Sequence, residues 1–244
     1  MFLRRLYLKE TIMSNHVSTI SPATRAIIRS HITESEKPIP WPYLDRNGNL
    51  TIGIGFHVPK RADFIKLPLS ILKNGTWVNA NQQEKIDAFD LMMVEKKKQS
   101  GRYNYAARSY REFTQIRMQR PDQDAMLDRI ITTNVGRIVK SVSAKAWNQL
   151  NDQQKAAATD IAHPFGGLKK FPNLRRAIIS GDAKNMAAES LFFTDRKTRA
   201  RDKPRLTRNL QAILNIKETA AKAELDKMLL DIDDRQAEDV DAPV

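Results

Sequence analysis

Glycine is scarce in this chain and concentrated in one place, and this distribution constrains the fold more than any other feature. The sequence has 9 glycines in 244 residues, and three of them, Gly48, Gly53 and Gly55, fall within eight residues. Prolines alternate through residues 38–42 and prevent helix there. Asn47-Gly48 between apolar, β-prone segments is a strong hairpin signal. The sequence therefore predicts a β-hairpin around this turn.

The remainder of the chain favours helix. Ser21 before Pro22 is an N-cap signal, and a helix is predicted from there to about Glu36. After about residue 79 the pattern is helical almost to the end. Capping-box spacing occurs at Asn81 with Glu84 and at Asn151 with Gln154. Helices are predicted at about 153–163, 173–180, 183–192 and from 205 onward, and the first of these, rich in alanine, is expected to be central and buried.

Composition excludes several classes of protein. Hydrophobic residues at 41% and charged residues at 28% are ordinary for a soluble globular protein. The sequence contains no cysteine, which excludes disulfides, thiolate metal sites and a thiol nucleophile. The four histidines have no metal-ligand spacing, so we expect neither a metal nor another cofactor. No apolar run is long enough to span a bilayer, and we identify no secretory signal at the N-terminus.

The sequence is strongly basic. It has 41 Lys and Arg against 28 Asp and Glu, a net charge of +13, which implies a polyanionic partner such as nucleic acid, an anionic membrane or the bacterial envelope. Zinc-finger, ribonucleoprotein and KH-type motifs are missing, so we do not expect nucleic acid to be the partner. The densest basic run, residues 196–208, is either a solvated helix face or a surface attracted to the anionic bacterial envelope.

Charge and composition also suggest how the chain is divided. We expect residues 1–20 to be an N-terminal extension and residues 21–217 to be one catalytic domain. Within that domain, residues 96–121 are polar, basic and irregular, and are predicted to be an insertion between helices. Residues 218–244 hold nine acidic and three basic residues, a net charge of −6, while the rest of the chain carries +19. Such a tail usually frays as solvated helix and coil, and folding back over a basic groove is the alternative.

Three polar residues around the predicted hairpin suggest glycoside hydrolysis. Glu36 ends the predicted helix, Asp45 precedes the turn, and Thr51 begins the returning strand. This arrangement can place two carboxyl groups across a cleft, where one protonates the leaving oxygen and the other acts on water or on the sugar. Taken singly, each has an ordinary structural explanation: a solvated helix end, a turn residue that bonds its own backbone, and a strand residue.

Helical geometry selects Glu36 rather than Glu34 as the acid. Ile28, Ile32 and Glu36 follow one another at intervals of four residues and therefore lie on one face of the predicted helix. Glu34 falls towards the opposite side. Glu36 is thus expected to be partly desolvated, an environment that suits a general acid.

Together these positions resemble the phage-type lysozymes, the endolysins of glycoside hydrolase family 24. The motif of that family is Glu, eight residues, then Asp-x-x-Gly-x-x-Thr-x-Gly-x-Gly-His. The matching positions in this chain are Glu36, Asp45, Gly48, Thr51, Gly53 and Gly55. Tyr43, two residues before the aspartate, also matches, whereas the family's final His is replaced by Phe56, with His57 one place later. Asp90 and Asp128 are rival candidates for the helix aspartate that pairs with the missing His.

The resemblance implies an α+β, mostly α, lysozyme-like fold with a small N-terminal lobe that carries the hairpin, a larger helical lobe, and a cleft between them. It implies hydrolysis of the β-1,4 bond between N-acetylmuramic acid and N-acetylglucosamine in peptidoglycan, with Glu36 as the acid and Asp45 with Thr51 activating the water. We expect the inverting course. Asp45 argues against a lytic transglycosylase, which uses one acidic residue and no attacking water. By the same resemblance the substrate-binding residues are His57, His163, Phe171, Asn173, Arg205 and Arg208.

The sequence leaves the biological role open. An endolysin released by a holin and an antibacterial effector injected into target cells would share these residues. We expect synthesis in the cytoplasm without a signal peptide and action in the periplasm or cell wall. The expected partners are peptidoglycan glycan strands, with an immunity or inhibitor protein or a secretion apparatus as further candidates. The rival hypothesis is a non-catalytic module that binds peptidoglycan or another polyanion on a lysozyme fold.

Overall fold

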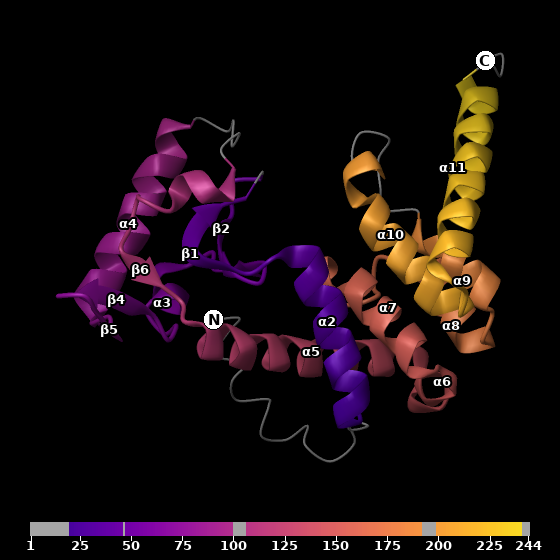
Figure 1. Cartoon of the computed structure of the whole chain (residues 1–244), viewed down its shortest axis with the longest axis horizontal. Coiled ribbons are helices and arrows are strands. Elements are labelled where there is room, and N and C mark those ends of the chain that lie inside the picture. Colours follow the sequence, from indigo (N-terminus) through magenta and orange to yellow (C-terminus); the bar gives the residue numbers. More distant parts are fainter. Residues whose placement is uncertain (1–19, 46, 100–105, 192–198, 241–244) are drawn as a thin grey trace. The chain divides into compact units, whose positions relative to one another are not determined.

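The computed structural model describes residues 20–45, 47–99, 106–191 and 199–240, with the side chains of 199–202 and 231–240 outside the description. This part of the chain is mostly helical and contains two small three-stranded antiparallel sheets (Figure 1). The predicted α+β, mostly α, class is confirmed. The chain divides into two compact units. We call Ile32–Ile130 the sheet unit, and Met1–His31 with Ile131–Val244 the helical unit.

The sheet unit contains both sheets. It takes in the end of helix α2 and the beginning of helix α5. Its elements are α2 (Pro22–Glu36), β1 (Ile39–Leu44), β2 (Leu50–Gly53), β3 (Phe56–His57), α3 (Arg61–Phe64), β4 (Ser70–Lys73), β5 (Thr76–Asn79), α4 (Gln82–Lys98), the short 3₁₀ helix η1 (Ala107–Tyr110), β6 (Ile116–Arg117) and α5 (Arg120–Val142).

Helix α2 begins and ends where the sequence predicts. The hydroxyl oxygen of Ser21 accepts a hydrogen bond of 3.0 Å from the backbone N–H of Thr24, the N-cap bond expected there. The last helical residue is Glu36, and Lys37 follows with a φ of 46°. A left-handed residue cannot continue a right-handed helix, so the helix ends at Glu36.

The predicted hairpin joins β1 to β2, and β3 adds to β2, giving the order β1-β2-β3. The turn is closed by two backbone bonds, from Asp45 N–H to the Asn49 carbonyl at 3.0 Å and from Gly48 N–H to the Asp45 carbonyl at 2.8 Å. Leu44 and Ile52 are buried in the hydrophobic core of the unit. The opposite side chains of these strands are therefore free to form a polar face.

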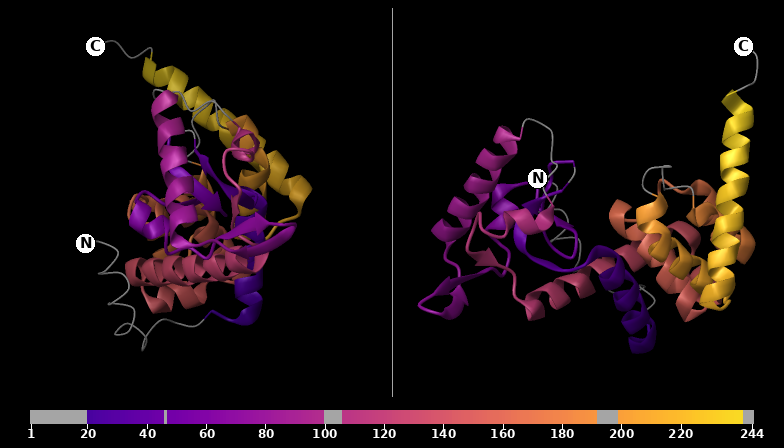
Figure 2. Two further views of the ribbon diagram at one scale, coloured as in Figure 1. Left: turned by 90° about the vertical axis from the view of Figure 1, so that its left-hand side faces the viewer. Right: turned by 45° about the horizontal axis from the view of Figure 1, so that its top comes forward.

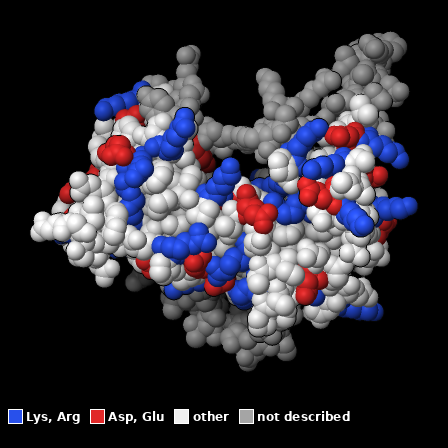
Figure 3. Space-filling model, viewed as in Figure 1, with Lys and Arg blue, Asp and Glu red and all other residues white. Residues whose placement is uncertain are grey.

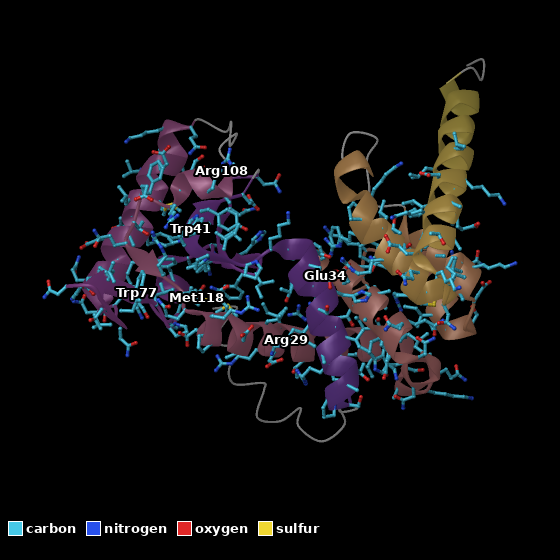
Figure 4. The ribbon with its side chains drawn as sticks, in the orientation of Figure 1. Arg29, Glu34, Trp41, Trp77, Arg108 and Met118 are labelled. Carbon is cyan, nitrogen blue, oxygen red and sulfur yellow. The ribbon has the colours of Figure 1, made fainter. Side chains whose placement is uncertain are left out.

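The second sheet, of order β5-β4-β6, was not predicted from the sequence. Asn74 and Gly75, at φ 49° and 78°, turn the chain between β4 and β5, as a type I′ turn requires. The same Asn-Gly signal that marks the first hairpin is present here. Trp77, labelled on this hairpin in Figure 4, is 45% exposed, so the amphipathic pattern that marks a strand is weak.

Part of the predicted insertion belongs to the core of the sheet unit. Of residues 96–121, the segment after residue 105 forms η1 and β6, and β6 pairs with β4. Tyr110 is fully buried and its hydroxyl donates to Gln99 Oε1 at 3.1 Å, while Ile116 and Met118 lie in the same core. The segment is polar on average, but a few of its side chains are deeply buried. Tyr103 and Tyr105 lie outside the described residues.

The helical unit is built from α-helices and one 3₁₀ helix in its described part. After the shared helices α2 and α5 come α6 (Ala144–Gln149), α7 (Asp152–Ala162), η2 (His163–Phe165), α8 (Pro172–Ser180), α9 (Ala183–Ser190), α10 (Arg199–Leu214) and α11 (Glu218–Val240). Helix α7 is the predicted central helix: its residues from Ala156 to Ala162 are all buried, and Asn151 with Gln154 forms the predicted capping box. Helix α10 starts earlier than predicted and carries Pro204 within it.

A buried ion pair joins α7 to α10. The carboxylate of Asp160 is fully buried and accepts from Arg205 Nε at 2.9 Å and from Nη2 at 3.1 Å. Asn209 Nδ2 donates to the same carboxylate at 3.1 Å, and Arg208 Nη2 lies 3.9 Å from it. Arg205, Arg208 and Asn209 are spaced for one helix face, so α10 presents its polar face to this one buried charge.

The predicted acidic tail is helical from its first residue. Helix α11, the long yellow helix in Figures 1 and 2, packs against α10. Ala221, Leu225 and Leu229 are buried, and Asp226 pairs with Lys203 at 2.9 Å. The first half of the tail is thus part of the helical unit, and residues 241–244 lie outside the description. Among the described helices, none has the length and apolar character needed to cross a membrane.

Replacing Asp160 with asparagine should destabilise the protein by about 3–5 kcal/mol, because it leaves partly buried guanidinium groups without their counter-charge. Urea unfolding followed by circular dichroism measures the change. The matched control is Asp226→Asn, which breaks an exposed pair and should cost less than about 1 kcal/mol. Equal costs for the two variants would show that the Asp160 pair does not hold α10 on α7.

Candidate active site

Three polar side chains form a row across the first sheet. Tyr43 on β1 lies opposite Thr51 on β2, and Thr51 lies opposite His57 on β3. Directly opposed residues of antiparallel strands point to the same face of the sheet. Tyr43 is half-buried, Thr51 is buried and His57 is exposed. The most buried residue is thus in the middle of the row, the exposed end is at His57, and Asp45 follows β1 at its end.

The carboxylate of Asp45 accepts three hydrogen bonds from described residues, and a ring nitrogen of His57 lies close to it. Oδ1 accepts from the backbone N–H groups of Asn47 and Asn49, each at 2.8 Å. Oδ2 accepts from Asn49 Nδ2 at 3.0 Å, and His57 Nε2 lies 3.1 Å from it. The side chain is thus the hydrogen-bonded centre of the turn, as its ordinary structural explanation predicts. The same carboxylate is one of the two groups that the motif assigns to catalysis.

Thr51 is tied to the same turn. Its hydroxyl donates to the carbonyl oxygen of Asn49 at 3.1 Å, and the residue is only 1% exposed. The hydroxyl therefore supports Asn49, which in turn binds both oxygens of Asp45. In the structure as described, Thr51 contributes to the shape of the turn and does not face solvent.

Glu36 lies against Gly55. Ile28 and Ile32 are fully buried and Glu36 is half-buried, whereas Glu34, labelled on α2 in Figure 4, is exposed, as the helical spacing predicts. A β-carbon added to Gly55 would lie 3.2 Å from Glu36 Oε2, and the φ of Gly55 is 65°. Glycine is therefore required at this position by its backbone conformation and by the close approach of the carboxyl group.

Tyr43 connects the two carboxyl groups electrostatically. Burial, and after it the negative charges of Glu36 and Asp45, raise the pKa of its hydroxyl to about 12. The phenol therefore keeps its proton at any physiological pH and remains a hydrogen-bond donor. Tyr43 was noted in the motif but not predicted as a site residue. Its position opposite Thr51 and two residues before Asp45 was the available signal.

His57 occupies a different place from the histidine of the family motif. Phe56, which stands at the motif position, is half-buried and packs on the core of the sheet unit. His57 contacts Asp45. Of the two rival helix aspartates, Asp90 pairs with Arg61 at 2.6 Å, and Asp128 lies on α5. The aspartate paired with His57 is therefore the one at the turn, and not either of the two that the family pattern suggested.

The other predicted substrate-binding residues belong to the helical unit. Phe171 is 3% exposed and meets Phe165 edge to face with ring centroids 5.0 Å apart, so its ring contributes to packing. Arg205 and Arg208 surround Asp160 as described above. The remaining two are His163, half-buried at the start of η2, and Asn173, which is exposed and accepts from Arg176. A substrate-binding role for these residues stays a prediction. Phe165, exposed beneath the ammonium group of Lys170, was not predicted.

Basic side chains of the described residues form no single stripe on the one face that Figure 3 draws. On the face drawn in Figure 3, Lys and Arg side chains are spread widely with Asp and Glu among them. A surface of this kind gives a general attraction to polyanions rather than a defined groove for one. Within the described residues, no cluster of three or more His, Asp or Glu side chains could hold a metal ion.

Comparison of the sequence with protein-family models and with curated proteins gives no match. The assignment of the site therefore depends on the spacing of the motif and on the geometry around Asp45 and Glu36.

Replacing Gly55 with alanine should cost more stability than replacing Gly75. Both glycines have a positive φ, which costs about 1–2 kcal/mol for an L-residue. A β-carbon at Gly75 meets nothing within 4 Å, whereas one at Gly55 meets Glu36. Urea unfolding measures the loss of stability in Gly55→Ala and in Gly75→Ala. Both variants share the cost of the positive φ, and only Gly55→Ala has the additional cost of the contact with Glu36. An equal loss in both variants would mean that Glu36 does not lie against Gly55.

Tyr43 should make the protein less stable as the pH rises from about 10 to about 12. In the unfolded chain the phenol ionises near its ordinary pKa of about 10, while the folded state keeps the proton to about 12. Ionisation therefore favours unfolding in this range, by about 2–3 kcal/mol at its upper end. The measurement is the free energy of unfolding of the wild type and of Tyr43→Phe at several alkaline pH values. Parallel curves for the two proteins would contradict the prediction.

Proposed function

We propose that this chain is a muramidase with a lysozyme-like fold, which hydrolyses the β-1,4 bond between N-acetylmuramic acid and N-acetylglucosamine in peptidoglycan. The observation that carries the proposal is the pair of carboxyl groups in the sheet unit. Glu36 lies against Gly55, Asp45 is held by its own turn, and both are close enough to Tyr43 for their charges to raise its pKa. The spacing of these residues matches the family motif.

The proposed reaction assigns one proton transfer to each carboxyl group. Glu36 gives its proton to the glycosidic oxygen, which leaves on N-acetylglucosamine. A water molecule adds to the anomeric carbon of N-acetylmuramic acid from the opposite face, and its proton passes to Asp45. Exchange of protons with solvent restores both groups. Attack by water inverts the configuration, so the first product is the α-anomer. Thr51 assists by holding the turn that positions Asp45.

The basic charge suits the proposed substrate. A net charge of +13 spread over the surface attracts the chain to an anionic bacterial envelope, and this attraction weakens as salt screens it. Action in the periplasm or cell wall follows from the proposed substrate. An endolysin and a delivered effector remain the two proposed roles, and an effector would have a dedicated inhibitor in the cell that makes it.

Glu36→Gln should abolish hydrolysis, because an amide of the same size cannot donate the catalytic proton. General acid catalysis contributes about 10²–10⁴-fold to the rate. Mass spectrometry of purified peptidoglycan after digestion should show reducing-end muropeptides with the wild type and none with the variant. Glu34→Gln, a matched change on the exposed side of the same helix, should keep the wild-type activity. Proton NMR of the fresh product should show the α-anomer.

Other products would identify the alternatives. Muropeptides with anhydro ends would indicate a lytic transglycosylase and would remove Asp45 from its role. The surroundings of Asp45 favour one rival, a non-catalytic module that binds peptidoglycan or another polyanion, because the carboxylate accepts three hydrogen bonds from its own turn and His57 lies 3.1 Å from it. Binding to the wall without any cleavage by wild-type protein would support that rival and overturn the muramidase.

A further inference from the structure

The surroundings of Asp45 conflict with the role of a general base. A carboxylate offers about four lone-pair positions. Asn47 and Asn49 donate three hydrogen bonds to it, two to Oδ1 and one to Oδ2, and His57 Nε2 lies 3.1 Å from Oδ2. A base must present a free lone pair to the water from which it takes a proton. One of these neighbouring groups therefore has to move before Asp45 can act, if the proposed hydrolysis is correct.

The three hydrogen bonds to Asp45 are fixed by the fold. The two bonds to Oδ1 come from the backbone of the turn. Asn49 also supplies Nδ2 to Oδ2, and its carbonyl oxygen accepts from Asp45 N–H at 3.0 Å and from Thr51 at 3.1 Å. Movement of Asn49 would break several bonds at once. Such a loss would open the turn itself.

His57 is the neighbouring group that can move away. It lies on β3, a two-residue strand at the edge of the sheet, and its side chain is 55% exposed. Of its ring nitrogens, Nε2 makes the contact to Asp45. An exposed side chain changes rotamer on the picosecond to nanosecond timescale, far faster than a typical enzymatic turnover. The imidazole can thus withdraw into solvent without disturbing the core.

We propose that His57 holds the position on Asp45 Oδ2 that the attacking water must occupy, and that its withdrawal admits the water. His57 is thereby a positioning residue that acts through Asp45. Its place in the row beside Thr51 puts the water on the exposed side of the carboxylate. The inference locates the nucleophile on this chain and goes beyond the motif, which has no histidine at this position.

Two variants of His57 separate this role from that of a simple support. His57→Ala removes the imidazole, and His57→Gln keeps a polar side chain that can still cover Oδ2. The values of kcat and KM are measured for both and for the wild type on a soluble peptidoglycan oligosaccharide, all under the same conditions. Glu36→Gln provides the inactive baseline. Thermal unfolding of each variant checks that the fold is kept.

The value of kcat is expected to be higher for His57→Ala than for the wild type, and to be no higher than the wild type for His57→Gln. His57→Ala should raise kcat roughly two- to tenfold, the factor that one polar contact represents, with KM unchanged. Loss of activity in His57→Ala with recovery in His57→Gln would overturn the inference in favour of a supporting role. Equal values of kcat for the three proteins would also overturn it.

Failure of the proposed function gives a different result. In that case the wild type matches Glu36→Gln and releases no reducing ends, and the muramidase and the inference are overturned together. An active wild type with the reversed order of His57 variants leaves the muramidase intact and removes only the inference.

Discussion

The hydrogen bonding of Asp45 to its own turn is the interaction on which the arrangement of the candidate site depends. Its Oδ1 atom binds two backbone N–H groups of the turn, which holds the ends of β1 and β2 in register. That register places Tyr43 beside Thr51, and β3 then places His57 beside Thr51 on the other side. A slip of one residue would point all three side chains to the opposite face. The polar row therefore exists because the turn is closed in one way.

The same bonds create a tension between structure and catalysis. A carboxylate that is surrounded by groups of its own protein is well ordered but less accessible to water. The conflict is localised at Oδ2, where one of the two neighbouring groups is an exposed side chain on an edge strand. Glu36 faces a related constraint, because a β-carbon at Gly55 would lie 3.2 Å from its carboxyl oxygen. In both cases the side chains around the carboxyl group limit what it can do.

In the helical unit, charged side chains predicted to bind substrate are paired with a buried charge of the protein itself. Arg205 and Arg208 were predicted as substrate-binding residues because they are basic and lie near the expected C-terminal helix. Both surround Asp160, a fully buried carboxylate on the central helix α7. A buried charge without partners is strongly unfavourable, so these guanidinium groups are needed to neutralise the buried carboxylate. The net charge of the chain therefore overstates the number of cations available to a polyanionic partner.

Local rules were sufficient for much of this protein. Proline and glycine spacing predicted the first hairpin, the N-cap at Ser21 and the capping boxes predicted their helices, and four-residue periodicity placed Glu36 on the half-buried side of α2. These features depend on residues a few positions apart. Only the tertiary structure decided that Tyr110 is buried within a polar segment, that Asp160 forms an ion pair with Arg205, and that His57 contacts Asp45. Each of these depends on residues distant in the sequence, whose approach is determined by packing and strand register rather than by local spacing.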